Sequence, residues 1–327
     1  MGEVLTARRT ETQSRLAKLK AHLGASAPRA EGKACIYITG SFGRGEASAH
    51  SDLDLFIVGL GTRNNRALPR LEEICIKADL IQATRDLHFP EFSGDGEYLE
   101  HYTEDELIGT LGQPEDDANN TFTARLLMLL ESQAVVGVSV YERVVKNVVA
   151  AYWRDYEDHK NEFIPAFLAN DILRLWRTFC VNYEARTATD PPEKKAKRKV
   201  KNYKLKHSRL LTCYSALLHL LSTYSLQQTV HPYDALDMAM LSPTERLETL
   251  LEQNHIAHAH ETIGALLKQY EVFLAATDAS EGEMVARFLD LARAREYFQS
   301  ANVLGDLTFK ALSLIGGENP FHRILMV

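Results

Sequence analysis

The stretch GSFGRGEASAHSDLDLFIV, residues 40–58, decides the fold of the first part of this chain. Before it stands KACIYITG (33–40), a run of β-branched and aromatic residues, and it runs into DLDLFIVGL (52–60), in which polar and apolar residues alternate. Both runs are typical of β-strands, and the Gly- and Ser-rich residues between them are typical of a tight turn. The sequence therefore predicts two strands joined by a turn.

Two acidic residues, Asp52 and Asp54, stand at the start of the second predicted strand. Residues i and i+2 of a strand point to the same side, so both carboxylates can bind the same metal ions. Carboxylates are hard oxygen ligands, which suit Mg²⁺, or alternatively Mn²⁺, bound together with substrate phosphates. On the turn, Gly40 allows the backbone to approach a triphosphate closely, and Ser41 can donate its hydroxyl and amide hydrogens. Arg44 is either a further phosphate contact or a solvated arginine.

The pattern Gly-Ser, ten residues, then Asp-Leu-Asp-Leu resembles the nucleotidyltransferase signature of the DNA polymerase beta superfamily. The resemblance implies a mixed sheet with flanking helices that transfers NMP from an NTP or dNTP to a hydroxyl and releases pyrophosphate. It also implies Mg²⁺ held by Asp52, Asp54 and a third carboxylate on a later strand. The residues that carry the resemblance are Gly40, Ser41, Gly45, Ser51, Asp52, Asp54 and Leu55.

The third carboxylate has several candidates in the sequence. Asp95, in FSGDGEYLEHY, is the first choice, with Glu97 and Glu100 as alternates, because each precedes or lies within a short strand-like segment. Asp79 is a weaker candidate, since its surroundings predict a helix. Without a third acid, the resemblance would imply a regulatory protein that binds nucleotides without turnover.

Organisation changes near residue 120. Before it, helical patterns at 3–23 and 68–86 flank the two strands, and after it long apolar periodic stretches predict helices. We therefore expect an α+β protein with a nucleotidyltransferase catalytic domain at 1–120 and an α-helical domain at 121–327. The stretches that predict the helical domain are 121–150, 162–186, 203–226, 243–270 and 281–315.

Composition sets the broad class of the protein. The chain has 327 residues, of which 45% are hydrophobic and 25% charged, enough for one large domain or two ordinary ones. No apolar run reaches the length of a membrane-spanning helix, and the first residues are polar where a signal peptide would be apolar. Four cysteines without a CxxC pair predict reduced thiols. These features favour a soluble cytoplasmic protein with no membrane partner.

A basic run, EKKAKRKVKNYKLKHSR at 193–209, carries nine Lys and Arg residues against one Glu, in a chain of formal net charge −7. It is either a solvated loop or a contact for a polyanion, since clustered cations displace counterions from phosphates. The run is expected in a loop and in the first turns of the helix at 203–226. In related nucleotidyltransferases a helical domain contributes Lys, Ser or Tyr to the triphosphate, so the resemblance implies this role for Lys204, Lys206 and Ser208.

The acceptor hydroxyl is left open by the sequence. The first choice is a nucleotide or oligonucleotide, as in family members that make signals for antiphage defence, because an isolated basic run suits such a ligand. A protein side chain and a small aminoglycoside-like molecule are the alternatives. A nucleotide-binding sensor that docks a partner is the alternative that is not an enzyme. The sequence does not predict the nucleobase or the oligomeric state.

Overall fold

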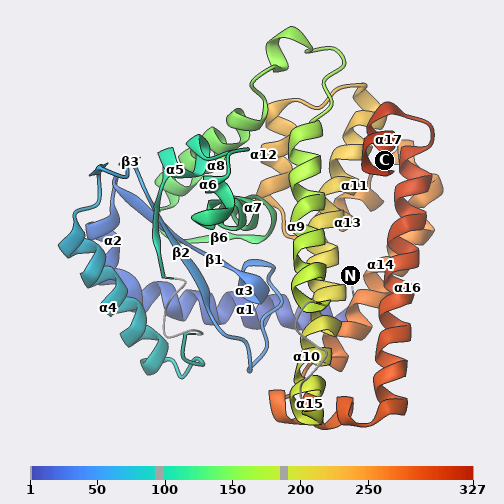
Figure 1. Ribbon diagram of the computed structural model, residues 1–327, viewed down its shortest axis with the longest axis horizontal. Helices are drawn as coiled ribbons and strands as arrows, with labels where there is room; N and C mark the ends of the chain where they lie inside the picture. The colour runs from blue at the N-terminus through green and yellow to red at the C-terminus, as the bar shows by residue number, and fades with distance from the viewer. Residues whose placement is uncertain (1, 93–98, 185–190, 327) are drawn as a thin grey trace. The chain divides into compact units, whose positions relative to one another are not determined.

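The computed structural model describes residues 2–92, 99–184 and 191–326 (Figure 1). Its contacts divide the chain into two units, Thr6–Arg154 and a second unit made of Met1–Leu5 with Asp155–Val327. The domain boundary expected at residue 120 lies inside the first unit. We call the first the sheet unit and the second the helical unit, and describe each by itself.

The sheet unit is built on a four-stranded mixed sheet. Strand β1 (Ala34–Thr39) pairs antiparallel with β2 (Asp54–Gly59), as the alternating pattern predicts. On its other side β1 pairs antiparallel with β6 (Gln133–Val136), and β2 pairs in parallel with β5 (His101–Thr103). The order β5-β2-β1-β6 therefore places the two predicted strands at the centre and makes β5 an edge strand.

Both faces of the sheet are buried at its centre, because β1 and β2 carry buried apolar residues on both sides. On one face Ile36 and Ile57 join a core with residues of α1 and α4. On the other, Tyr37 stacks on Phe56 with 5.3 Å between ring centroids, and the hydroxyl of Tyr37 donates to the carbonyl oxygen of Ala124 in α7. Helices thus cover the sheet on both sides, which gives an α+β unit as expected.

The stretch 121–150 differs from the continuous helix that its apolar residues predict. It forms α7 (Thr121–Glu131), then β6, then α8 (Val138–Tyr152). Gly137, with φ +69°, separates β6 from α8, and a Cβ there would lie 2.3 Å from the carbonyl oxygen of Ala34. Because β6 completes the sheet, the residues up to 154 belong to the sheet unit. The remaining elements of this unit are α1 (Glu3–His22), η1 (Leu23–Ala25), α2 (Ser26–Ala30), α3 (Gly40–Gly43), β3 (Gly61–Thr62), β4 (Asn65–Arg66), α4 (Arg70–Asp86), α5 (Glu104–Gly109) and α6 (Glu115–Ala118).

The helical unit confirms the expectation of a predominantly helical C-terminal region. The basic run, however, is mostly helix rather than loop: it forms most of α10 (Pro192–Lys204) and a π-helical turn at Leu205–Arg209. Pro192 begins the helix, where its missing N–H costs nothing, and Ala196 and Val200 are buried at helical spacing. The other helices are η3 (Tyr156–Asp158), α9 (Ala166–Glu184), α11 (Leu210–Gln227), α12 (Pro232–Met240), α13 (Pro243–Leu251), η5 (Asn254–Ala259), α14 (His260–Ala276), α15 (Glu281–Leu289), α16 (Leu291–Gly316) and α17 (Pro320–Met326).

Hydropathy sets a further limit on these helices. Within the described ranges, none is long and apolar enough to cross a membrane.

Candidate active site

The turn between β1 and β2 brings the two halves of the sequence motif together. Thr39 ends β1 and is the register partner of Asp54, the first residue of β2. The hydroxyl of Thr39 donates to the backbone carbonyl of Asp54 over 3.3 Å. The residues between them leave the sheet through α3, so that Gly40 and Asp54 face each other across the end of the two strands.

Gly40 lies against the carboxylate of Asp54. Its φ is +65°, a backbone conformation that residues with a side chain rarely adopt. A Cβ at this position would lie 2.5 Å from Oδ2 of Asp54. Glycine is thus required twice, for the backbone conformation and for the space that the carboxylate fills. The backbone N–H of Gly40 donates to Oε1 of Glu131 over 3.1 Å.

Asp52 and Asp54 lie on the side of the chain that faces away from the core. Leu53 and Leu55 are both buried in the apolar core, and successive residues of an extended chain point to opposite sides. Asp52 is exposed and Asp54 is half-buried. The expected alternation of acids and leucines is therefore present.

These two aspartates fit a divalent cation by the chemistry of their oxygen donors. Among the described residues, no group of three or more His, Cys, Asp or Glu side chains is arranged to hold a metal ion. Asp52 and Asp54 therefore stay a prediction as metal ligands, and a complete ligand set would need further groups.

The candidates for a third carboxylate lie in different surroundings, and two of them are outside the described residues. Asp95 and Glu97 lie outside the described residues. Asp79 accepts hydrogen bonds from Ser26 over 2.8 Å and from Arg29 over 3.0 Å, so that it ties α4 to α2. Glu100 is exposed and immediately precedes β5, the strand that pairs with β2.

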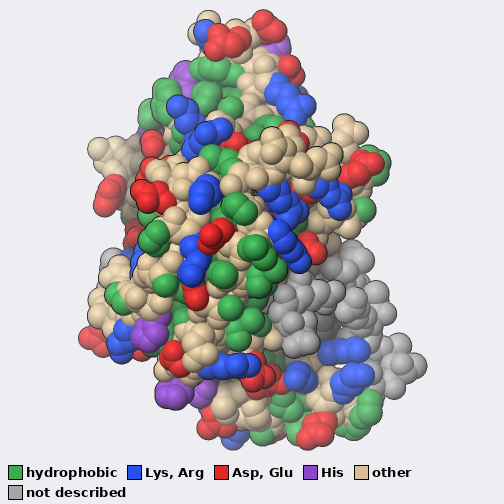
Figure 2. Space-filling view, turned by 90° about the vertical axis from the view of Figure 1, so that its left-hand side faces the viewer, with side chains coloured by type: hydrophobic (Ala, Val, Ile, Leu, Met, Phe, Trp, Pro, Cys, Tyr) green, Lys and Arg blue, Asp and Glu red, His purple; other side chains and the backbone are tan. Residues whose placement is uncertain are grey.

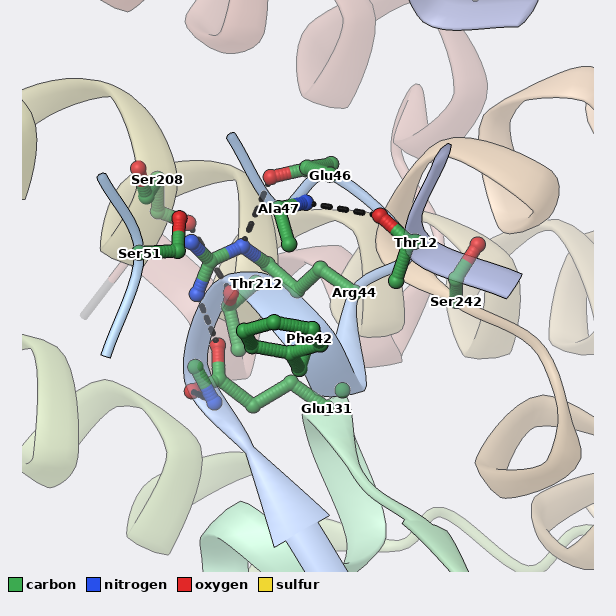
Figure 3. A network of polar contacts seen from close by, with 12 residues as sticks. Thr12, Phe42, Arg44, Glu46, Ala47, Ser51, Glu131, Ser208, Thr212 and Ser242 are labelled. Atoms are coloured by element: carbon green, nitrogen blue, oxygen red, sulfur yellow. Dashed lines mark hydrogen bonds and ion pairs between the residues drawn. The ribbon is translucent and has the colours of Figure 1, made fainter. Parts of the chain in front are cut away.

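Arg44 is buried rather than solvated. Its Nε lies 2.9 Å from Oε2 of Glu46, and its Nη1 lies 2.9 Å from Oε2 of Glu131 at the end of α7 (Figure 3). Figure 3 also shows Ala47, whose N–H donates to the hydroxyl of Thr12 over 2.8 Å. Nothing in the local sequence marks Glu46 or Glu131 as partners of Arg44, and residues 44 and 131 lie far apart along the chain of the sheet unit.

The remaining loop residues are ordered by hydrogen bonds within the turn. The N–H of Ser48 donates to the hydroxyl of Ser51 over 2.9 Å, and the guanidinium of Arg15 donates to the carbonyl of Ser48. Arg15 also lies over the ring of Phe42, 4.9 Å from its centroid. Ser41, half-buried in α3, is held by its carbonyl, which accepts from the N–H of Glu46 over 2.7 Å.

Lys204, Lys206 and Ser208 belong to the helical unit. Lys204 ends α10 and is exposed, and Nζ of Lys206 lies 5.6 Å from the ring centroid of Phe298. The carbonyl of Ser208 accepts a hydrogen bond from Thr212 over 2.9 Å. Their role toward a nucleotide stays a prediction, since the helical unit is described by itself.

A comparison with known protein families identifies a domain that contains the turn between β1 and β2. Residues 23–108 match the family model of the nucleotidyltransferase domain, a range that contains β1, α3, β2, α4 and β5. The chain thus carries a nucleotidyltransferase domain of the polymerase beta-like kind, and the resemblance drawn from the motif is confirmed at the level of this domain. The match supports a transferase that acts on nucleotides, and such domains generally use divalent metals. No curated protein and no solved structure matches the chain.

Proposed function

We propose that this protein is a Mg²⁺-dependent nucleotidyltransferase that moves NMP from an NTP or dNTP to a hydroxyl and releases pyrophosphate. The observation that carries the proposal is the contact between Gly40 and Asp54. A glycine in a left-handed conformation leaves room for a carboxylate at the end of two strands, inside a segment that matches the nucleotidyltransferase family. Bound Mg²⁺ would neutralise developing charge on the phosphates.

Each residue of the turn has a separate part in this proposal. Asp52 and Asp54 hold the metal, and the hydroxyl of Ser41 donates to a phosphate oxygen. The N–H of Gly40 is already bonded to Glu131, so Gly40 serves by leaving space rather than by donating. Arg44 is bonded to two carboxylates, so we assign it the role of positioning the turn rather than that of contacting phosphate.

Glu100 is the third carboxylate that we propose from the described residues, with Asp95 and Glu97 as the alternatives. Leu99 packs in the core beside Leu55, and Tyr102 lies beside Phe56, 6.3 Å between ring centroids. Alternation therefore puts Glu100 on the face of Phe56 and Asp54. Continued by one residue before Ile57 and His101, the parallel register would align Glu100 with Phe56 and put the Cα atoms of Glu100 and Asp54 about 8 Å apart.

The acceptor that we propose is a nucleotide or an oligonucleotide. Support comes from α10, whose exposed face holds Lys194, Lys195, Lys197 and Lys201, since clustered cations favour a polyanion. An oligonucleotide product would suit signalling in antiphage defence inside the cytoplasm. The alternatives are a protein side chain as the acceptor and a sensor that binds nucleotides without turnover. The experiment below distinguishes them from a nucleotide acceptor.

The test is incubation of the full-length protein with each α-labelled NTP and dNTP and Mg²⁺ or Mn²⁺, followed by separation of small products, oligomers and labelled protein. We expect label in one discrete product, and none with Asp52→Asn/Asp54→Asn. Asp86→Asn, which removes an exposed aspartate at the end of α4, is the matched control and should keep full activity. Label on the protein itself would favour protein modification. Nucleotide binding without turnover by the wild-type protein would contradict the proposal that it is an enzyme.

A further inference from the structure

A cavity of about 570 Å³ lies beside the edge strand β5 in the sheet unit. Its walls come from the β3–β4 hairpin, the first turns of α4, β5 and the residues before α7. Residues 40–54, all of which are described, are not among its lining residues. Figure 2 views the side of the molecule on which α4 lies, where Lys and Arg side chains stand close to acidic ones.

The centre of this cavity is a buried carboxylate with an excess of cationic neighbours. Glu73, whose side chain is 2% exposed, has Nζ of Lys77 at 2.7 Å, Nη1 of Arg70 at 3.2 Å and Nη1 of Arg66 at 3.6 Å. Nδ1 of His101 lies at 3.1 Å. Burial acts to raise the pKa of Glu73, but hydrogen bonds from Lys77 and His101 outweigh it and lower that pKa. One ionised carboxylate thus faces three permanent cations.

Among these cations, Arg66 has the fewest of its N–H donors in short hydrogen bonds. Its Nε is buried and has no hydrogen-bond partner among the described residues. Its Nη1 makes only long contacts, 3.6 Å to Glu73 and 3.4 Å to His101. A buried donor without an acceptor costs about 1–3 kcal/mol, more when it is charged. Arg66 also lines the cavity, where an anionic ligand would accept from its Nη groups in place of these long contacts.

The surrounding walls leave the cavity positive and add amide groups. Arg63, Arg66, Arg70 and Lys77 line it together with three acids, so one positive charge is in excess when His101 is neutral. Asn119 and Asn120 form another wall, and Asn120 is the N-cap of α7, an eleven-residue helix. The positive end of the α7 dipole adds to the attraction for an anion.

We propose that this cavity binds the phosphate group of a small phosphorylated molecule, with Arg66 and Arg70 as its principal ligands. A guanidinium group presents two N–H donors in the geometry of two phosphate oxygens. The guanidinium of Arg66 is half-buried, so its position is restricted by the residues around it. The volume is that of small-molecule sites. Asp52 and Asp54 do not line the cavity, whereas Glu100, the third carboxylate proposed above, does. The phosphate site does not rest on the proposed transferase activity.

The test is calorimetric titration of the full-length protein with inorganic phosphate and with pyrophosphate, in EDTA so that no metal site contributes. We expect saturable binding at one site, weakened at least tenfold in Arg66→Gln/Arg70→Gln. Binding should be unchanged in Asp52→Asn/Asp54→Asn and in Arg85→Gln, which removes an exposed arginine from the same helix. No saturable binding, or equal binding by the Arg66→Gln/Arg70→Gln variant, would overturn the proposal.

A second measurement on the unaltered protein covers the case in which the double variant does not fold. The Nε–H resonance of Arg66, assigned by its loss in Arg66→Gln, should shift on addition of phosphate in a ¹H–¹⁵N spectrum. A resonance that stays in place at saturating phosphate would contradict Arg66 as a ligand. Because neither readout uses nucleotide turnover, failure here and failure of the proposed transferase are distinguishable.

Discussion

Arg44 and Glu131 form a buried ion pair, with 2.9 Å between Nη1 and Oε2, that joins the turn after β1 to the end of α7. The other oxygen of Glu131 accepts the N–H of Gly40, and Gly40 in turn lies against the carboxylate of Asp54. A single glutamate thus fixes both ends of α3. The geometry of the candidate metal site depends on this link.

Arg44→Met should destabilise the protein strongly, because it removes the guanidinium that forms ion pairs with the buried carboxylates of Glu46 and Glu131. Removing one partner of a buried ion pair costs about 3–5 kcal/mol. The free energy of unfolding in urea measures the effect, with Arg85→Met as the exposed control. Arg44→Lys should recover only part of the loss, since one ammonium replaces a fork that bonds two carboxylates. A loss no greater than that of the control would contradict the structural role of Arg44.

Gly40→Ala should reduce activity far more than stability. The new Cβ would lie 2.5 Å from Oδ2 of Asp54, so the carboxylate must move, and a displacement of this size costs about 100-fold in rate. Backbone strain adds about 1–2 kcal/mol of destabilisation. Gly24→Ala, where no atom outside its own helix and chain neighbours lies within 4 Å, is the matched control. Nucleotidyl transfer that matches the Gly24→Ala control would show that Gly40 does not set the position of Asp54.

Arg125 should be indispensable for the fold of the sheet unit. It is fully buried in α7 and binds both oxygens of Asp116, at 2.9 and 2.5 Å, the carbonyl of Leu107 at 2.9 Å and the hydroxyl of Tyr152 at 3.0 Å. Burial acts to lower the pKa of Arg125, but the hydrogen bonds that it donates to Asp116 and Tyr152 outweigh burial and raise that pKa, so the guanidinium stays charged. Arg125→Met should cost about 3–5 kcal/mol. Replacing both partners, as Arg125→Met/Asp116→Leu, should recover part of this loss in thermal unfolding, and no recovery would contradict the pair.

The stability of the helical unit should fall as the pH drops from about 6.5 to about 4. Burial lowers the pKa of His207 to about 4, and burial together with Arg246 lowers that of His219 to about 4. Both histidines fold as neutral groups, so in this window the unfolded chain binds more protons than the folded one. Stability is therefore present above the unfolded pKa and decreases on acidification, by up to about 3 kcal/mol for each histidine.

His207→Phe isolates this effect. The His207 ring stacks on Phe273, 4.4 Å between centroids, and phenylalanine keeps that contact without titrating. The slope of unfolding free energy against pH should become shallower in the variant. An unchanged slope between pH 6.5 and 4 would show that His207 does not contribute.

The central strands and their turn could be predicted from the sequence because their signals are local. Alternating acids and leucines set the direction of Asp52 and Asp54, and glycines mark the turn. β6 was missed because Gln133–Val136 lies within a long apolar stretch and is a strand only through pairing with β1, a hundred residues away. The helix of the basic run was missed because only Ala196, Val200 and Tyr203 mark its buried face.

The partners of Arg44 and the cations around Glu73 could not be predicted for the same reason. Each arrangement joins residues from different elements, as Glu73 of α4 and His101 of β5 do. Local patterns do not encode such contacts. Glu100, which we propose as the third carboxylate, belongs to this class as well, because its position beside β2 follows from the pairing of β5 with β2.

The most direct test of the central claim is the binding of Mn²⁺ to the full-length protein in the presence of ATP, followed by electron paramagnetic resonance. The account predicts that Mn²⁺ binds the wild type and Asp86→Asn equally, and that Asp52→Asn/Asp54→Asn weakens binding at least tenfold. Equal affinity in all three proteins would contradict the assignment of Asp52 and Asp54 as the metal ligands.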